Sequence, residues 1–226
     1  MNKNHNQQFC LLKFLSVIVL LIVSILLVPI IVEKHKEVIL LNNSKLMLDG
    51  IDVNLVKAVR ENMYNLEVDV VKTPEYKELK RSLYNLSVQD NKYRFIYFMG
   101  ISEVGKILFL VDNEPEWSRE LSPPGQLYYE ANNVIYQIFE GKQSSNVVKI
   151  EDRWGTWISG FVGLYEGDDI IAVMGIDVEE SIWKGSIATL SSIPILVLII
   201  FAVFLLDRIF PNNSDNSNQK RKKSKK

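Results

Sequence analysis

The stretch from Asp152 to Trp154, which opens the sequence DRWGTWISGF, carries side chains suited to holding a small ligand. Aromatic faces can form the wall of a binding box, and Asp152 or Arg153 can meet an opposite charge on the ligand. A structural interpretation competes with this one, because Trp154 can also mark a turn that Gly155 allows to bend tightly. We predict that Asp152, Arg153 and Trp154 contact ligand.

The second half of the same stretch has the alternation of a strand. Period-2 spacing places Trp157, Ser159 and Phe161 on one face, opposite Ile158 and Gly160. Large aromatic residues on such a face usually pack in a core. We therefore predict that Trp157 and Phe161 belong to the core, and that Ser159 on the same face contributes to the site.

Two acids and two tyrosines complete the candidate site. Asp112 ends a predicted strand, where a carboxylate can point into the mouth of a pocket. Asp177 also lies near a strand end, but the sequence VEESIWKG after it favours capping of a helix. Tyr97 and Tyr128 each offer a ring face and a hydroxyl, although tyrosine is also ordinary strand material. We predict ligand contacts from Asp112, Tyr97 and Tyr128.

Catalytic signatures do not occur in the sequence. No Gly-x-Ser-x-Gly, His-Glu-x-x-His or P-loop pattern is present. The two histidines, His5 and His35, stand in no motif, and residues 33–185 contain no cysteine for a Cys/His zinc site. The sequence predicts a protein that is not an enzyme and has no metal site and no cofactor.

Two long segments without charged residues frame the chain. Residues 14–32 and 186–206 are each long enough to cross a bilayer as a helix. The first exceeds the apolar core of a secretory signal and is followed by no small-x-small cleavage site, so we read it as an uncleaved anchor. The predicted organisation is a tail (1–13), a transmembrane helix (14–32), a folded domain (33–185), a second transmembrane helix (186–206) and a basic disordered tail (207–226).

The charges set the expected orientation. Residues 1–13 carry +2, and residues 207–226 carry seven Lys/Arg against two Asp, or +5. Residues 33–185 carry 17 Lys/Arg against 25 Asp/Glu, or −8. Because basic flanks stay on the cytoplasmic side, we predict a two-pass cell-membrane protein with both termini cytoplasmic and the central domain extracytoplasmic. The basic tail is expected to meet anionic lipid and not nucleic acid.

The periodicity of the central region changes once. Helical spacing runs through residues 33–66, with a break at Asp49-Gly50, and through 73–86, where Thr73 and Pro74 form a start signal. Strand patterns follow at 93–100, 106–112, 146–150, 156–165 and 169–178, with an irregular segment and a short helix over 128–141 between the second and third. We predict an α+β domain with a five-stranded antiparallel sheet and N-terminal helices.

Residues 90–185 resemble a known class of sensor domain. The segments YFMG…GKILFLVD, PPGQLYY and DRWGTWISGFVGLYEGDDIIAVMGIDVEESIW are similar to extracytoplasmic PAS-like domains of the Cache superfamily. Such domains precede histidine kinase, diguanylate cyclase or chemoreceptor modules. The resemblance implies a PAS-like fold and a small ligand, such as an organic acid or amine, held between the sheet and a capping segment. It also implies a helix that carries the signal out of the domain.

The sequence departs from that class after the second apolar segment. Twenty residues follow it, and they contain neither a phosphoacceptor helix nor a Gly-Gly-Asp-Glu-Phe segment. We therefore expect either a separate histidine kinase or cyclase acting in trans, or a truncated receptor, and a homodimer as in paired receptors. The alternative is a membrane-anchored interaction or assembly module of the cell surface, in which the irregular segment around Trp117 is an exposed contact.

Overall fold

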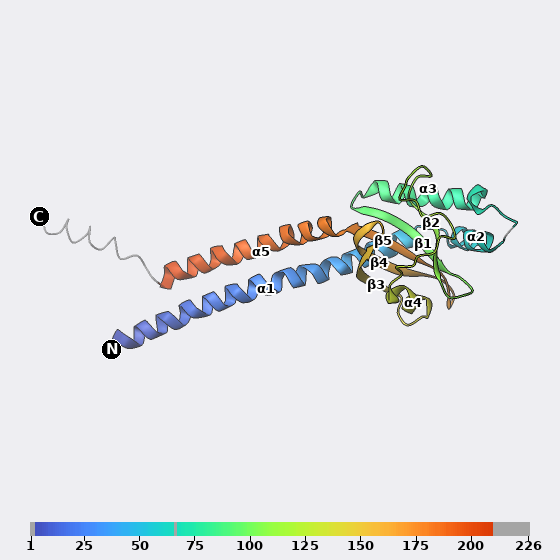
Figure 1. Cartoon of the computed structure of the whole chain (residues 1–226). Helices are drawn as coiled ribbons and strands as arrows, with labels where there is room; N and C mark the ends of the chain where they lie inside the picture. Colours follow the sequence, from blue (N-terminus) through green and yellow to red (C-terminus); the bar gives the residue numbers. More distant parts are fainter. Residues whose placement is uncertain (1–2, 66, 210–226) are drawn as a thin grey trace, which may run out of the picture. The chain divides into compact units, whose positions relative to one another are not determined.

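The computed structural model describes residues 3–65 and 67–209 (Figure 1), so most of the predicted basic tail lies outside the described residues. The chain divides into two compact units. One is Lys34–Gly185, and the other comprises the end segments up to Glu33 and from Ser186. The helices are α1 (Lys3–Asp49), α2 (Val53–Tyr64), the 3-10 turn η1 (Val70–Lys72), α3 (Pro74–Gln89), α4 (Asn133–Phe139) and α5 (Glu180–Ile209). The strands are β1 (Tyr93–Ile101), β2 (Ile107–Asp112), β3 (Ser145–Asp152), β4 (Gly155–Glu166) and β5 (Asp169–Glu179).

Two of the described helices are long and apolar enough to cross a membrane. They are Leu15–Asp49 within α1 and Glu180–Leu205 within α5. None of the apolar window of the first is buried, and only 11% of the second is. A core helix of a globular protein would bury such residues, so the exposed apolar surface needs another apolar environment.

The helices of the Lys34–Gly185 unit begin where the sequence signals predict. The Asp52 side chain accepts a hydrogen bond from the backbone amide of Asn54 at 2.9 Å and so caps α2. Thr73 Oγ1 accepts from the amide of Tyr76 at 3.3 Å, and Pro74 occupies the first position of α3. These side chains satisfy amides that the first turn of a helix leaves without partners.

The five strands form one antiparallel sheet in the order β2-β1-β5-β4-β3. The last strand in sequence, β5, therefore lies in the middle, between β1 and β4. The predicted α+β fold, a PAS-like five-stranded antiparallel sheet with N-terminal helices, is confirmed.

Helices cover both faces of this sheet (Figure 1). The end of α1, with α2 and α3, covers one face, where Val56, Val59, Leu79 and Leu83 are fully buried. Gly160 of β4 turns toward α1, and a Cβ there would lie 3.1 Å from the Leu40 side chain. The opposite face is covered by α4 and the irregular chain that precedes it.

The helix predicted over 128–141 is shorter than expected. Asn132 caps α4 by accepting from the amide of Val134 at 3.0 Å, so the helix begins at Asn133. Upstream, the amide of Tyr128 donates to the carbonyl of Ile107 at 2.9 Å. That bond holds Tyr128 beside β2 as extended chain, which is why the helix cannot start there.

Candidate functional site

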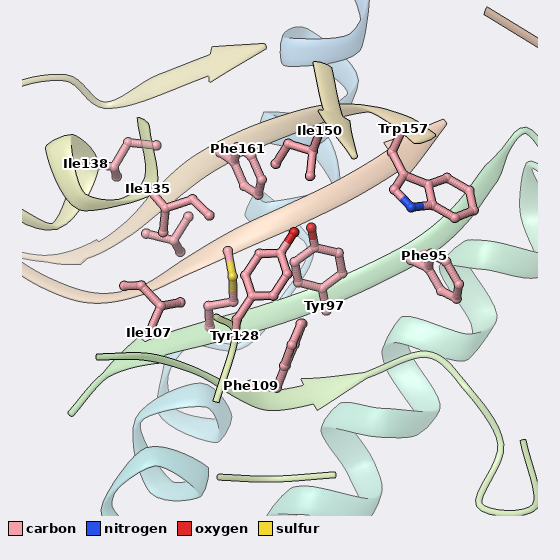
Figure 2. Packing of buried hydrophobic residues seen from close by; sticks show 12 residues of the cluster. Phe95, Tyr97, Ile107, Phe109, Tyr128, Ile135, Ile138, Ile150, Trp157 and Phe161 are labelled. Carbon is pink, nitrogen blue, oxygen red and sulfur yellow. The ribbon is translucent and has the colours of Figure 1, made fainter. Parts of the chain in front are cut away.

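A cavity lies on the face of the sheet that α4 and the irregular chain cover. We call residues 113–126, which follow β2, the capping segment. Aromatic and acidic side chains from all five strands, the capping segment and the turns around it line the cavity (Figure 2 shows five of the aromatic ones). They are Phe95, Tyr97, Phe109, Asp112, Glu120, Ser122, Tyr128, Asp152, Trp154, Trp157 and Asp177.

Asp152, the last residue of β3, is the hydrogen-bonding centre of one wall. Its Oδ1 accepts from the amides of Trp154 and Gly155 at 3.0 and 3.2 Å and from the Trp157 indole Nε1 at 3.1 Å. Its Oδ2 accepts from the Tyr128 hydroxyl at 2.9 Å. The carboxylate thus closes the hairpin and orients two aromatic rings at the same time.

The spacing Asp-x-x-Gly-x-Trp follows from this geometry. Asp152 and Gly155 pair at the closed end of the β3–β4 hairpin. Gly155 has φ +150°, and a Cβ there would lie 2.9 Å from Cζ2 of Trp157. Only glycine allows the Trp157 ring to lie back over the turn and reach Asp152.

Arg153 points out of the cavity. Its guanidinium lies 4.6 Å from the ring centroid of Trp154 and forms an ion pair with Glu130 at 2.8 Å. The pair is partly exposed, so it contributes little to stability, but it holds the outer face of Trp154.

Asp177 of β5 is deeply buried in the wall of the cavity, with 4% of its surface exposed. It accepts a hydrogen bond from the Tyr97 hydroxyl at 3.2 Å and another from the hydroxyl of Ser159, its cross-strand partner on β4. Burial raises the pKa of Asp177 to about 7, and the nearby charge of Asp152 adds to that increase, against the opposing effect of the hydrogen bonds.

A glycine positions the tyrosine that contacts Asp177. Gly175 pairs with Tyr97 across β5 and β1, and a Cβ at Gly175 would lie 2.3 Å from Cε2 of that ring. The ring therefore lies flat over the backbone of β5. Burial raises the pKa of both Tyr97 and Tyr128 well above the ordinary value, so each hydroxyl keeps its proton and acts as a donor.

Asp112 fastens the capping segment to the end of β2. Its carboxylate accepts from the amides of Ser122 at 2.6 Å and Glu114 at 3.1 Å, and from Lys80 Nζ of α3 at 3.2 Å. Burial raises the pKa of Asp112 even though these donors oppose the rise. With these three donors, the carboxylate of Asp112 links the end of β2 to the capping segment and to α3.

Arg94 of β1 also binds the capping segment, through ion pairs. Its guanidinium donates to the carboxylates of Glu114 and Glu120, both on the capping segment. The hydrogen bonds from Arg94 and Ser118 hold the pKa of Glu114 below its ordinary value, although burial opposes them. Two cations, Lys80 and Arg94, thus hold the segment that closes the cavity.

Aromatic rings in edge-to-face and tilted contact form the remaining surface. Phe109 lies 5.4 Å from Tyr97, 5.3 Å from Tyr128 and 5.8 Å from Trp154, measured between ring centroids. Phe95 meets Trp157 edge to face at 5.0 Å. Figure 2 shows the hydroxyls of Tyr97 and Tyr128 pointing in the same direction above this layer.

The cavity is small and acidic. Its internal volume is about 20 Å³, room for about one water, and the space between the lining side chains out to the open mouth is about 310 Å³. Among the described residues, the lining includes four carboxylates and no lysine, arginine or histidine. The described part of the chain also contains no group of three His, Cys, Asp or Glu side chains that could hold a metal ion.

Five of the seven predicted site residues line this cavity: Tyr97, Asp112, Tyr128, Asp152 and Trp154. Arg153 and Ser159 do not line it. Arg153 lies outside, behind Trp154, and Ser159 lies beneath Asp177 as its hydrogen-bond partner. Whether any of the seven contacts a ligand stays a prediction.

The expectation that Asp177 caps a helix is wrong. Asp177 lies within β5, and its carboxyl turns into the cavity because Val173, Gly175 and Asp177 share one face of the strand. The strand predicted over 169–178 already contains Asp177, and its alternation places Asp177 on the same face as Val173 and Gly175. Trp157 is in the core as predicted, with 7% exposed, yet it also lines the cavity. Four further residues line the cavity without a sequence signal that marks them as site residues: Phe95, Phe109, Glu120 and Ser122.

Comparison with known proteins yields no family. No family model matches the chain, and no curated protein matches it. Among solved structures, the ligand-binding domain of the Campylobacter jejuni chemoreceptor Tlp3 in complex with 4-methylisoleucine is 15% identical, with a TM-score of 0.36 over 70% of this chain and 62% of that one. The periplasmic sensory domain of Tlp1 from the same organism is 13% identical, with a TM-score of 0.34 over 70% and 64% of the two chains.

A different kind of protein also matches. The type II free methionine-R-sulfoxide reductase of Thermoplasma acidophilum is 14% identical, with a TM-score of 0.33 over 67% of this chain and 97% of that one. The alignments cover less than two thirds of the length of the two chemoreceptor domains. The resemblance to the Cache superfamily therefore stays a prediction.

Proposed function

We propose that the protein is a membrane-anchored, non-enzymatic sensor that binds a small ligand outside the cytoplasm. The observation that carries this proposal is the position of Asp177. It lines a cavity of aromatic and acidic side chains, and it lies on β5 three residues before Glu180, the first residue of α5. Because strand and helix follow each other without a linker, a shift of Asp177 on ligand binding moves the start of α5.

Contacts inside the Lys34–Gly185 unit support this route. Glu180 forms an ion pair with Lys149 of β3 at 2.7 Å, and Lys36 of α1 donates to the carbonyl of Trp183 at 3.2 Å. The Lys36 ammonium also lies 4.1 Å from the Trp183 ring centroid. The first turn of α5 is therefore tied to the sheet and to α1, and a displaced β5 must change these contacts.

The lining favours an amine over an organic acid. Four carboxylates face the cavity without a cation among the lining side chains, and aromatic faces surround them. An ammonium group on a ligand is attracted both by a carboxylate and by the face of an aromatic ring, whereas a carboxylate on a ligand would be repelled by the acids of the lining. We therefore propose a small organic cation as the ligand.

The proposed topology follows from the apolar helices and the charges. The windows within Leu15–Asp49 and Glu180–Leu205 expose their apolar side chains, and the basic flanks lie outside them in sequence. We propose a two-pass cell-membrane protein with both termini cytoplasmic and the Lys34–Gly185 unit extracytoplasmic. Cysteine labelling at residues 2 and 168 in intact cells, with Cys10 replaced by serine, tests this orientation.

A thermal-shift experiment tests the ligand proposal. The full chain in detergent micelles is heated in the presence of small amines, amino acids and matched organic acids. A compound that binds only the folded state raises the midpoint by mass action. We expect amines to stabilise the protein, Trp154→Ala to abolish the effect, and Trp117→Ala, which removes a tryptophan outside the cavity, to retain it.

Two results would count against the sensor. One is a well-folded protein that none of the compounds stabilises. The other is a stabilisation that persists unchanged in Trp154→Ala and Asp177→Asn, because the ligand would then bind elsewhere. Stabilisation by acids and not by amines would retain the sensor and refute the assignment of a cation.

A second candidate function is a membrane-anchored interaction module. The observation that favours it is Trp117, on the capping segment, whose surface is 86% exposed. Iodide quenching of a variant that keeps only this tryptophan separates the two. If a small ligand protects Trp117 from iodide quenching, Trp117 belongs to the segment that closes over the cavity. If only a partner protein protects it from quenching, Trp117 is a docking contact.

The partners expected from the sequence stay predictions. They are a homodimer, a separate histidine kinase or cyclase, and anionic lipid at the basic tail. Crosslinking of the full chain in its own membranes, followed by mass spectrometry of the products, tests all three partners in one preparation: the second copy, the kinase or cyclase, and the lipid.

A further inference from the structure

Two carboxylates of unequal surroundings face the same cavity. This inference rests on the proposed cation sensor and concerns how the site is occupied before the ligand arrives. Asp152 and Asp177 both line the cavity, and the charge of one acts on the other. Two carboxylates in a poorly solvated space without a cation cannot both remain ionised at low cost, so one of them holds a proton.

The hydrogen-bond donors decide which one. Asp152 is half-buried and accepts four hydrogen bonds, two of them from backbone amides. Those donors stabilise a negative charge. Asp177 is 4% exposed, and its hydrogen-bond partners among the described residues are the hydroxyls of Tyr97 and Ser159. A hydroxyl can either donate or accept, so these two partners also suit a protonated carboxyl.

No cation from a neighbouring element compensates Asp177. Tyr97 faces it from β1, Asp152 from the end of β3 and Tyr128 from the chain before α4. The other acids of the lining are engaged elsewhere, Asp112 with Lys80 and Glu120 with Arg94.

We propose that the unliganded site carries a proton on Asp177 below neutral pH and that the cationic group of the ligand takes the place of this proton. On binding, the O–H bond of the Asp177 carboxyl breaks and its proton passes to water. The carboxylate left behind accepts a hydrogen bond from the ammonium group of the ligand. The charge of the cavity is the same before and after the exchange, which avoids both an unpaired buried anion and an unpaired buried cation.

The exchange makes binding depend on pH. With the pKa of Asp177 at about 7, a cation has to displace the proton below neutrality but not above it. We expect binding to be about tenfold weaker at about pH 6 than at about pH 8, with nearly one proton released per cation bound at the lower value.

The buried proton is tested without any ligand. Infrared difference spectra of the full chain in detergent micelles, between about pH 5.5 and about pH 8.5, should show the carbonyl band of a buried carboxylic acid. Asp177→Asn should lack that band and Asp168→Asn, on the exposed β4–β5 turn, should keep it. Asp152→Asn should keep the band with a lower midpoint, because the charge of Asp152 raises the pKa of Asp177. A spectrum of Asp177→Asn identical to that of the wild type would overturn the proposal.

The exchange is tested with methylammonium as the probe and with acetate and methanol as controls of opposite and zero charge. Calorimetric titration at about pH 6 in phosphate and in MES buffers, which differ in heat of ionisation and carry no net positive charge, gives the number of protons released. Binding of methylammonium with pH-independent affinity and no proton release refutes the exchange and leaves the cation sensor standing. A protein that shows the infrared band but binds methylammonium at neither pH refutes the cation sensor and the exchange together.

Discussion

The substitution Asp177→Asn should remove a pH dependence of stability that the folded chain otherwise shows. The pKa of Asp177 rises from an ordinary 3.8 to about 7 on folding. Between these values the folded protein holds a proton that the unfolded chain has released, so the free energy of unfolding falls as pH rises through this window. About three pH units at about 1.4 kcal/mol each give a total loss of about 4 kcal/mol, complete above about pH 7.

Urea unfolding, followed by tryptophan fluorescence, measures this loss. All four tryptophans lie between residues 117 and 183, so they report on the Lys34–Gly185 unit. Between about pH 5 and about pH 8, the wild type should lose roughly 3 kcal/mol more than Asp177→Asn. The difference between the two curves isolates Asp177 because the other acids contribute equally to both. The amide keeps the shape of the protonated carboxyl.

Parallel curves for the two proteins would refute the reasoning. They would mean that Asp177 is ionised in the folded state at low pH, or that solvent reaches it. Asp168→Asn serves as the matched control, since its side chain is on an exposed turn, and its curve should follow that of the wild type.

Three further substitutions test the packing around the cavity, each by urea unfolding. Gly175→Ala places a Cβ within 2.3 Å of the tyrosine ring that covers it and should cost roughly 2 kcal/mol, whereas Gly185→Ala, with nothing within 4 Å, should cost nothing measurable. Lys80→Met leaves the buried carboxylate of Asp112 without its cation and should cost roughly 3 kcal/mol, part of which Lys80→Met combined with Asp112→Asn should recover. Thr73→Ala removes the cap of α3 and should cost about 1 kcal/mol; a loss near zero would show that the helix start depends on tertiary packing alone.

Local signals made most of the fold predictable. Thr73 followed by Pro74 is a local start signal for a helix, and the change to period-2 spacing after residue 92 indicates strands before their partners are known. The Asp152–Trp157 motif was informative for the same reason, since its hydrogen bonds span only a few residues. The structure bears out the structural interpretation, and the same residues also line the cavity, so the binding interpretation stays a prediction.

The parts that escaped prediction depend on pairing between distant segments. Asp177 looks like a helix cap until β4 places Ser159 opposite it and β1 places Tyr97 above it. Glu120 and Ser122 carry no periodic signal at all. Their positions are set by Arg94 and Asp112, which lie in other elements. A single sequence does not reveal which residues of distant strands and loops lie opposite each other.

The strand order has a consequence for how the domain is made. β5 is synthesised last of the five strands but occupies the middle of the sheet, between β1 and β4. Until it arrives, both of these strands present open edges, and no continuous sheet can form. Because β5 is followed directly by the apolar residues of α5, the sheet is completed only when the second hydrophobic segment is also emerging. In the proposed membrane-anchored protein, the cavity would therefore be assembled at the same late stage of synthesis at which α5 enters the membrane. A chaperone that shields strand edges would act in this interval.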